Sequence, residues 1–138
     1  MTDPNTETNP HADQRLRTDP IVWFGSTRPD GRPHLVPVWF LWDGGTMLVF
    51  TKAGSQKVKN LRANPSVTLA LDGTGDGDDI VIVEGEAELL AEPTAAVVTP
   101  AYIEKYSPMM AQMGMTAEGM AAEYAQPIRV RPTKVIAW

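Results

Sequence analysis

Six stretches of the chain carry the alternating or continuous apolar pattern of a β-strand, and turn-forming residues separate them. Pro37 interrupts the second stretch, which indicates an edge strand or a bulge because proline has no N–H to donate to a ladder. Gly85 marks a bulge in the fifth stretch. The predicted strands are residues 21–25, 33–42, 46–52, 66–72, 79–90 and 128–138.

Helical patterns fall between these strands. Residues 55–62 predict a short helix with Ser55 as its N-cap, which ends before Asn64. The stretch from 93 to 126 is rich in alanine, methionine and glutamate and predicts two helices, roughly 93–106 and 116–125. A helix after the third strand and helices before the last favour a mainly β, α+β barrel over a parallel sheet.

The length and the polarity of the N-terminus set the domain organisation. With 138 residues the chain predicts one domain, over residues 19–138. Residues 1–18 are polar and predict a flexible tail. No signal-peptide pattern and no apolar run long enough for a membrane span occurs, and there is no cysteine. We therefore expect a soluble, cytoplasmic protein without a membrane span.

The net charge of −5 argues against a nucleic-acid partner, because nucleic-acid binding depends on clustered lysine and arginine. The basic residues are nevertheless concentrated in one segment. Lys52, Lys57, Lys59 and Arg62 lie within a short stretch of this acidic chain. Such a local cluster favours a small phosphorylated ligand over a polymer.

Other candidate sites are weak. The glycines of residues 73–77 precede a strand and lie among aspartates, so they predict a hairpin loop and not a phosphate-binding loop. His11 and His34 have no metal-ligand spacing, so no metal site is expected. Five methionines between 109 and 120 favour core or interface packing, with lining of a substrate pocket left as an alternative.

Residues 50–60 form the strongest local feature, because a strand ends there and a helix begins. The free amides near Ser55 point at one spot, and the Thr51 and Ser55 hydroxyls lie close by. Lys57 falls in the first helical turn, where a positive charge is unfavourable unless an anion is bound. On these residues alone, a phosphate-binding Lys57 and a solvated surface lysine both remain open.

That segment and its surroundings resemble the pyridoxamine 5′-phosphate oxidase-like superfamily of FMN-binding split-barrel proteins. The resemblance covers roughly residues 19–90 and the last strand, in family order. It implies a six-stranded split β-barrel with short flanking helices, and a homodimer with the cofactor at the subunit interface. The stretches that carry it are residues 30–33, 35–40, 49–65, 84–88 and 129–138.

The resemblance also assigns roles by position. Ser55, Gln56 and Lys57 would bind the cofactor phosphate with help from Thr51, and Phe50 would pack near the ring or ribityl chain. Trp138 would reach the cofactor of the partner subunit. The cofactor's ring system would lie along the backbone of Val36, Pro37, Val38 and Trp39. In a cofactor with a longer anionic tail beyond the phosphate, that tail would meet the side chains of Lys52, Lys59 and Asn60.

Departures from the vitamin B6 oxidases narrow the implied function. Gln56 stands where those enzymes have arginine, Ile80 replaces a glutamine that contacts the ring, and the chain ends at Trp138 before the substrate-binding basic residues. The DPIVWFG, LVPVWF and KVIAW strings are similar to the actinobacterial branch that uses the deazaflavin coenzyme F-420. This implies an oxidoreductase that reduces an unsaturated organic small molecule by hydride transfer. An FMN-dependent oxidoreductase and a non-catalytic cofactor carrier are the alternatives, and no catalytic side chain is assigned.

Overall fold

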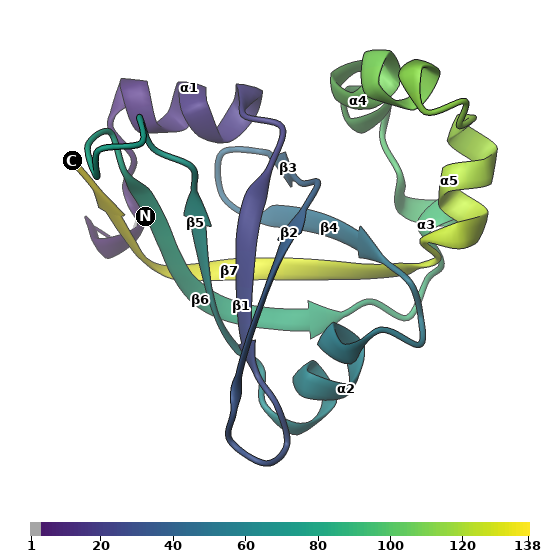
Figure 1. Cartoon of the computed structure of the whole chain (residues 1–138), viewed down its shortest axis with the longest axis horizontal. Coiled ribbons are helices and arrows are strands. Elements are labelled where there is room, and N and C mark those ends of the chain that lie inside the picture. The colour runs from purple at the N-terminus through teal and green to yellow at the C-terminus, as the bar shows by residue number, and fades with distance from the viewer. Residues whose placement is uncertain (1–3) are drawn as a thin grey trace.

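The structure, a computed structural model, describes residues 4–138. All β-strands belong to one antiparallel sheet with the order β2-β1-β5-β6-β7-β4-β3 (Figure 1). The strands are β1 Val22–Thr27, β2 Pro33–Val38, β3 Leu41–Trp42, β4 Met47–Thr51, β5 Ser66–Leu71, β6 Val81–Leu89 and β7 Gln126–Ala137. The helices are the 3-10 turn η1 Pro4–Thr6, α1 Pro10–Thr18, α2 Gln56–Ala63, α3 Thr94–Val97, α4 Pro100–Gln112 and α5 Ala117–Glu123.

The connection between β2 and β3 forces the sheet to curl. These strands lie at opposite edges of the sheet, yet only Trp39 and Phe40 separate them. The step from Val38 to Leu41 spans at most roughly 11 Å of extended chain. The two edges must therefore approach each other, and the mainly β, curled sheet agrees with the predicted class (Figure 1).

The sheet has seven strands, so the prediction of six was wrong. The predicted strand 33–42 is divided at Phe40, whose backbone groups bond to helix α4 and not to a ladder. The Phe40 N–H donates to Tyr106 Oη at 2.8 Å, and its carbonyl accepts from Lys105 Nζ at 2.9 Å. Pro37 does lie in an edge strand, as predicted.

The bulge predicted at Gly85 is present where β6 pairs with β7. The register shifts between Glu84 and Gly85, because Glu84 lies opposite Lys134 and Gly85 lies opposite Pro132, which leaves Thr133 as the extra residue. A Cβ on Gly85 would approach the Arg131 carbonyl oxygen to 2.5 Å. Glycine is therefore required there by the close approach of the two backbones.

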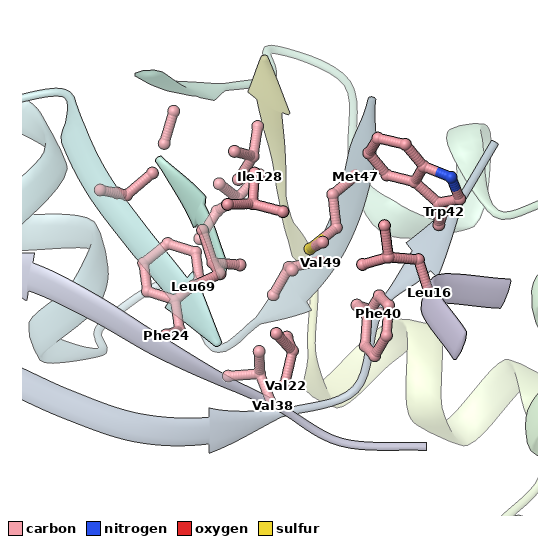
Figure 2. Close-up of a cluster of buried hydrophobic side chains, with 14 of the residues drawn as sticks. Leu16, Val22, Phe24, Val38, Phe40, Trp42, Met47, Val49, Leu69 and Ile128 are labelled. Atoms are coloured by element: carbon pink, nitrogen blue, oxygen red, sulfur yellow. The ribbon is translucent and has the colours of Figure 1, made fainter. Parts of the chain in front are cut away.

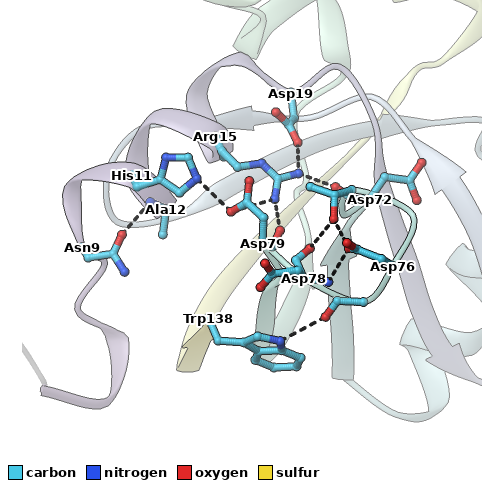
Figure 3. A network of polar contacts seen from close by, with 12 residues as sticks. Asn9, His11, Ala12, Arg15, Asp19, Asp72, Asp76, Asp78, Asp79 and Trp138 are labelled. Carbon is cyan, nitrogen blue, oxygen red and sulfur yellow. Dashed lines mark hydrogen bonds and ion pairs between the residues drawn. The ribbon is translucent and has the colours of Figure 1, made fainter.

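Part of the predicted flexible tail, residues 1–18, forms helix α1. Residues 1–3 of that tail lie outside the described residues, but Pro10–Thr18 is a helix with Asn9 as its N-cap. Leu16 is fully buried in the main core, so this segment is held by apolar packing despite its polar composition. The half-buried Arg15 donates to the Asp72 and Asp79 carbonyl oxygens, which ties α1 to the β5–β6 loop (Figure 3).

The main core fills the inside of the curl. Leu16 of α1 lies beside Phe40 at one side of this core, and Phe24 lies beside Leu69 at the other (Figure 2). All four side chains are fully buried. A second apolar cluster lies between β4 and the helices α4 and α5. This second cluster positions the helices that cover the candidate site.

Helix α4 runs through Pro108, where the sequence predicted a break between helices. Proline lacks the N–H that would bond to the carbonyl of Glu104, but Pro108 is exposed, so water can reach the freed carbonyl. Tyr102, Tyr106 and Met110 are buried on one face at helical spacing and hold the helix together. Within residues 4–138, no helix is both long and apolar enough to cross a membrane.

Candidate functional site

A cavity of about 300 Å³ lies where the end of β2 and the end of β4 meet helices α4 and α5. This volume is within the range of small-molecule sites. The lining is mostly aromatic and aliphatic, with one ammonium group. Its residues are Ile21, Pro37, Val38, Trp39, Phe50, Thr51, Lys57, Tyr102, Met109, Met113, Met115, Met120 and Tyr124.

Lys57 supplies the charge of this cavity. Its ammonium is half-buried, and burial lowers the pKa of Lys57 below its ordinary value. Among residues 4–138 it forms no hydrogen bond or ion pair, in contrast to Lys52, which pairs with Glu123 at 3.3 Å. A partly desolvated ammonium without a carboxylate is stabilised by an anionic ligand. Lys57 therefore fits a phosphate group in the cavity.

The first turn of helix α2 is open toward the same region. Ser55 is its N-cap residue, but its hydroxyl makes no capping bond and lies 3.2 Å from Thr51 Oγ1. The amides of the first turn thus keep their capacity to donate, as helix N-termini do toward anions. Gln56 is directed to Asn60, whose Oδ1 accepts from Gln56 Nε2 at 2.8 Å.

Helices α4 and α5 form an aromatic and thioether cover over the cavity. Trp39 stacks on Tyr106 with ring centroids 4.5 Å apart and an interplanar angle of 4°. Phe50 lies against Tyr102 at 4.7 Å with the rings tilted by 59°. Burial raises the pKa of the Tyr102 hydroxyl far above its ordinary value, so this hydroxyl stays protonated. The cover can enclose a flat apolar molecule and offer it a neutral hydroxyl.

Hydrogen bonds from α4 hold this cover against the chain between β2 and β3. Tyr106 Oη accepts from the Phe40 N–H and lies 3.0 Å from the Phe40 carbonyl oxygen and 2.8 Å from that of Pro20. Lys105 Nζ lies 3.8 Å from the Phe40 ring centroid. Burial lowers the pKa of Lys105 to about 8. Trp39, the neighbour of Phe40, is thereby fixed in the cavity wall.

The structure gathers six of the thirteen predicted site residues in this cavity. They are Pro37, Val38, Trp39, Phe50, Thr51 and Lys57. Ser55 and Gln56 stand beside it at the start of α2. Val36 packs against the main core and does not line the cavity.

Four predicted residues lie elsewhere. Lys59 is exposed on α2 and does not line the cavity. Asn60 is fully buried and donates to Ser26 Oγ at 3.0 Å, so it joins α2 to β1 and does not line the cavity. Lys52 is exposed and pairs with Glu123. Trp138 follows β7 at the end away from Gln126, the residue opposite Thr51, and donates to the Gly77 carbonyl at 3.1 Å (Figure 3).

The methionines and tyrosines of the helical segment were not assigned to the site from the sequence. Met109, Met113, Met115 and Met120 line the cavity, while Met110 and Met120 are buried in the second apolar cluster, so the structure supports both the predicted core packing and the alternative of a pocket lining. The clustering of these methionines between residues 109 and 120 was the signal in the sequence that could have assigned them to the site. Nothing in the sequence indicated that Tyr106 and Lys105 bind the backbone of Phe40, which lies more than sixty positions earlier.

Comparisons with known proteins agree with the fold. A solved structure named F420 reductase is 23% identical to this chain with a TM-score of 0.70, and the match covers 94% of this chain and 98% of the other. A conserved hypothetical protein from Mycobacterium tuberculosis is 26% identical with a TM-score of 0.73, covering 100% and 89%. A FAD-binding protein from Mesorhizobium loti is 21% identical with a TM-score of 0.64, covering 88% and 85%.

No curated protein matches the chain. The family model described as pyridoxamine 5′-phosphate oxidase matches residues 8–138, which include every strand of the sheet and both walls of the cavity. Because this match spans nearly the whole chain, the protein belongs to the pyridoxamine 5′-phosphate oxidase family.

Proposed function

We propose that the protein is an oxidoreductase that binds the deazaflavin coenzyme F-420 and reduces an unsaturated organic molecule. The observation that carries the proposal is Lys57, a half-buried ammonium without an ion pair in the described chain, at the edge of an apolar cavity. The likeness to a structure named F420 reductase supports the choice of cofactor. When bound, the deazaflavin supplies a carbon that gives or takes a hydride.

The residues of the chain would divide the work between an anionic and an apolar half of the site. Lys57, Ser55 and the first-turn amides of α2 would hold the phosphate, with Thr51 orienting the Ser55 hydroxyl. The edge strand β2 would support the ring along Val36–Trp39. The substrate would lie under the cover of α4 and α5, where apolar side chains exclude water.

We also propose that two copies of the chain assemble and that Trp138 reaches the cofactor of the partner subunit. Trp138 is 60% exposed although it is large and aromatic. From Gln126, opposite Thr51, to Trp138 the chain runs for roughly 35–40 Å if it is extended. This length of chain separates the indole from Lys57 within one subunit, and a second copy would bring it to a cofactor.

An FMN-dependent oxidoreductase is the second candidate. The family match and the likeness to a FAD-binding protein favour a flavin, and a phosphate at Lys57 serves either cofactor. Absorbance and fluorescence titrations of the full chain with coenzyme F-420 and with FMN separate the two. Binding of F-420 tighter than that of FMN is the expected result, and tight FMN binding without F-420 binding contradicts the deazaflavin proposal.

Turnover then separates an enzyme from a cofactor carrier. Reduced F-420 is mixed with the protein and a panel of conjugated acceptors, and its oxidation is followed by absorbance. Steady oxidation that depends on an acceptor is expected. Stoichiometric binding without oxidation across the panel would instead support the carrier alternative.

A further inference from the structure

His34 has a buried ring nitrogen that the protein leaves without a hydrogen-bond partner. Among the described residues, Nδ1 of His34 is the buried side-chain nitrogen or oxygen for which no partner exists. A buried donor or acceptor without a partner costs about 1–3 kcal/mol, so such a group calls for an explanation. A ligand atom that bonds to this nitrogen would provide one.

The sheet register places His34 beside helix α2. His34 in β2 lies opposite Ser26 in β1, and Ser26 is bonded to Asn60 of α2. Val36, two residues further along β2, packs against the main core, so His34 lies on the same face of the strand as Val36. That face is turned toward α2, and the Lys57 ammonium of this helix acts electrostatically on the His34 ring.

The charges around His34 are mostly positive. Arg28, in the turn before β2, and Lys57, in α2, both lower the pKa of His34, after the larger effect of burial. A second cavity, of about 530 Å³, is lined by His34, and Glu84 is the single carboxylate in its lining. In the same turn Asp30 is paired with Arg32 at 2.8 Å. The free protein therefore disfavours a charged His34, and an anion beside Lys57 reverses that preference.

We propose that His34 is an anion-binding residue of the cofactor site, which takes up a proton when a phosphate oxygen binds between its imidazole and the Lys57 ammonium. This inference rests on the proposed function and deepens it, because it adds a ligand to the phosphate and couples binding to pH. The ligand class is a phosphate ester. The proton comes from solvent, and His34 becomes an imidazolium that donates to the bound oxygen.

The coupling has a defined sign. In the free protein the pKa of His34 lies below its ordinary value of 6.5, and a bound phosphate raises it. Binding is therefore tightest below the free pKa, and it weakens as pH rises through the pKa of the complex. One linked proton limits this to about a tenfold change in Kd per pH unit.

Histidine NMR tests the proposal directly, because the chain has only two histidines. The full chain carrying ¹³C-labelled histidine is titrated with pH alone, with saturating FMN, with riboflavin and with inorganic phosphate. His34→Gln assigns the two signals. We expect FMN and phosphate to raise the pKa of His34 by about 1 unit or more, with no change from riboflavin or at His11.

An affinity measurement gives the second readout. Kd for FMN is measured from pH 6.5 to 8 for the natural protein and for His34→Gln, whose folding is checked by its thermal midpoint. The natural protein should lose affinity more steeply than the variant. The comparison cancels the titration of the phosphate itself, whose second pKa is about 6.

The outcomes separate the two proposals. If FMN or F-420 binds with dependence on Lys57 but the pKa of His34 does not move, the His34 proposal is overturned and the cofactor proposal stands. If neither cofactor binds yet inorganic phosphate raises the pKa of His34, the anion site stands and the cofactor proposal fails. If neither cofactor nor phosphate moves the pKa, both are overturned. The experiment on the natural protein decides even if the variant does not fold.

Discussion

Lys57 has a half-buried ammonium and no ion pair in the described chain. We therefore expect its charge to lower the stability of the free protein and to strengthen cofactor binding. Lys57→Met removes a charge that burial disfavours, so the free energy of unfolding should not fall. The same change should weaken cofactor binding by roughly 1.5–3 kcal/mol, the scale of a charged hydrogen bond. Chemical denaturation and cofactor titration measure the two effects.

Arg62→Met is the matched control, because Arg62 is an exposed basic residue on the same helix and no role in the site is assigned to it. It should leave both quantities nearly unchanged. A loss of stability in Lys57→Met with unaltered cofactor affinity would show that Lys57 has a structural role, and the phosphate proposal would then be wrong.

Lys105 makes a prediction about pH. Burial lowers its pKa from 10.5 to about 8, so between about pH 8 and 10 the unfolded chain binds more protons than the folded chain at this position. The free energy of unfolding should therefore rise with pH in this window, by at most about 1.4 kcal/mol per unit. The buried tyrosines Tyr102 and Tyr106, whose pKa values are raised, oppose this trend above pH 10.

Urea denaturation at several pH values, compared between the natural protein and Lys105→Met, isolates this contribution. The difference in stability between the two should shift toward the natural protein as pH rises from 8 to 10. A difference that does not depend on pH in this window would contradict the burial of a charged Lys105.

At the scale of elements, the Tyr106 hydroxyl and the Lys105 ammonium attach helix α4 to the chain around Phe40. Tyr106→Phe keeps the ring stacked on Trp39 but leaves the buried Phe40 N–H without its acceptor. We expect a loss of about 1–3 kcal/mol in the free energy of unfolding. Tyr102→Phe is the control, because no hydrogen bond of the Tyr102 hydroxyl occurs within residues 4–138, and it should cost less. Equal losses in the two variants would contradict the attachment.

The same elements show what the sequence could and could not predict. Strand positions follow from local apolar patterns and turn residues, and the bulge beside Gly85 follows from one glycine. The end of β2 at Val38 depends on hydrogen bonds from Tyr106, which no local pattern contains. Helix α1 was missed because its polar composition hides one decisive residue, Leu16, whose burial depends on the finished sheet.

The candidate site divides in the same way. The part formed by β2, β4 and the start of α2 was predictable, because residues such as Lys57 lie at a strand–helix junction visible in the sequence. The cover of α4 and α5 was not, because a methionine cluster is equally suited to a core. The burial of Asn60 was not predictable, because it depends on a hydrogen bond to Ser26, a residue of β1 that lies far away in the sequence.

At the scale of the whole molecule, the proposed dimer requires each site to contain Lys57 from one subunit and Trp138 from the other. Lys57→Ala and Trp138→Ala should each weaken cofactor binding when tested alone. When the two variants are unfolded together and refolded as a mixture, half of the dimers formed at random carry one lesion in each subunit. In such a dimer one site combines the intact Lys57 with the intact Trp138, and the other site has both lesions.

The mixture should therefore regain tight cofactor binding in about one quarter of its sites, since half of the dimers each recover one of two sites. If Trp138 acted within its own subunit, every site would keep one lesion and mixing would recover nothing. Refolding each variant alone controls for the procedure, and mass spectrometry under native conditions measures the fraction of mixed dimers. Recovery in proportion to that fraction would place Trp138 across the subunit interface from Lys57. This arrangement is the one we expect, because the length of β7 separates the two residues within one chain.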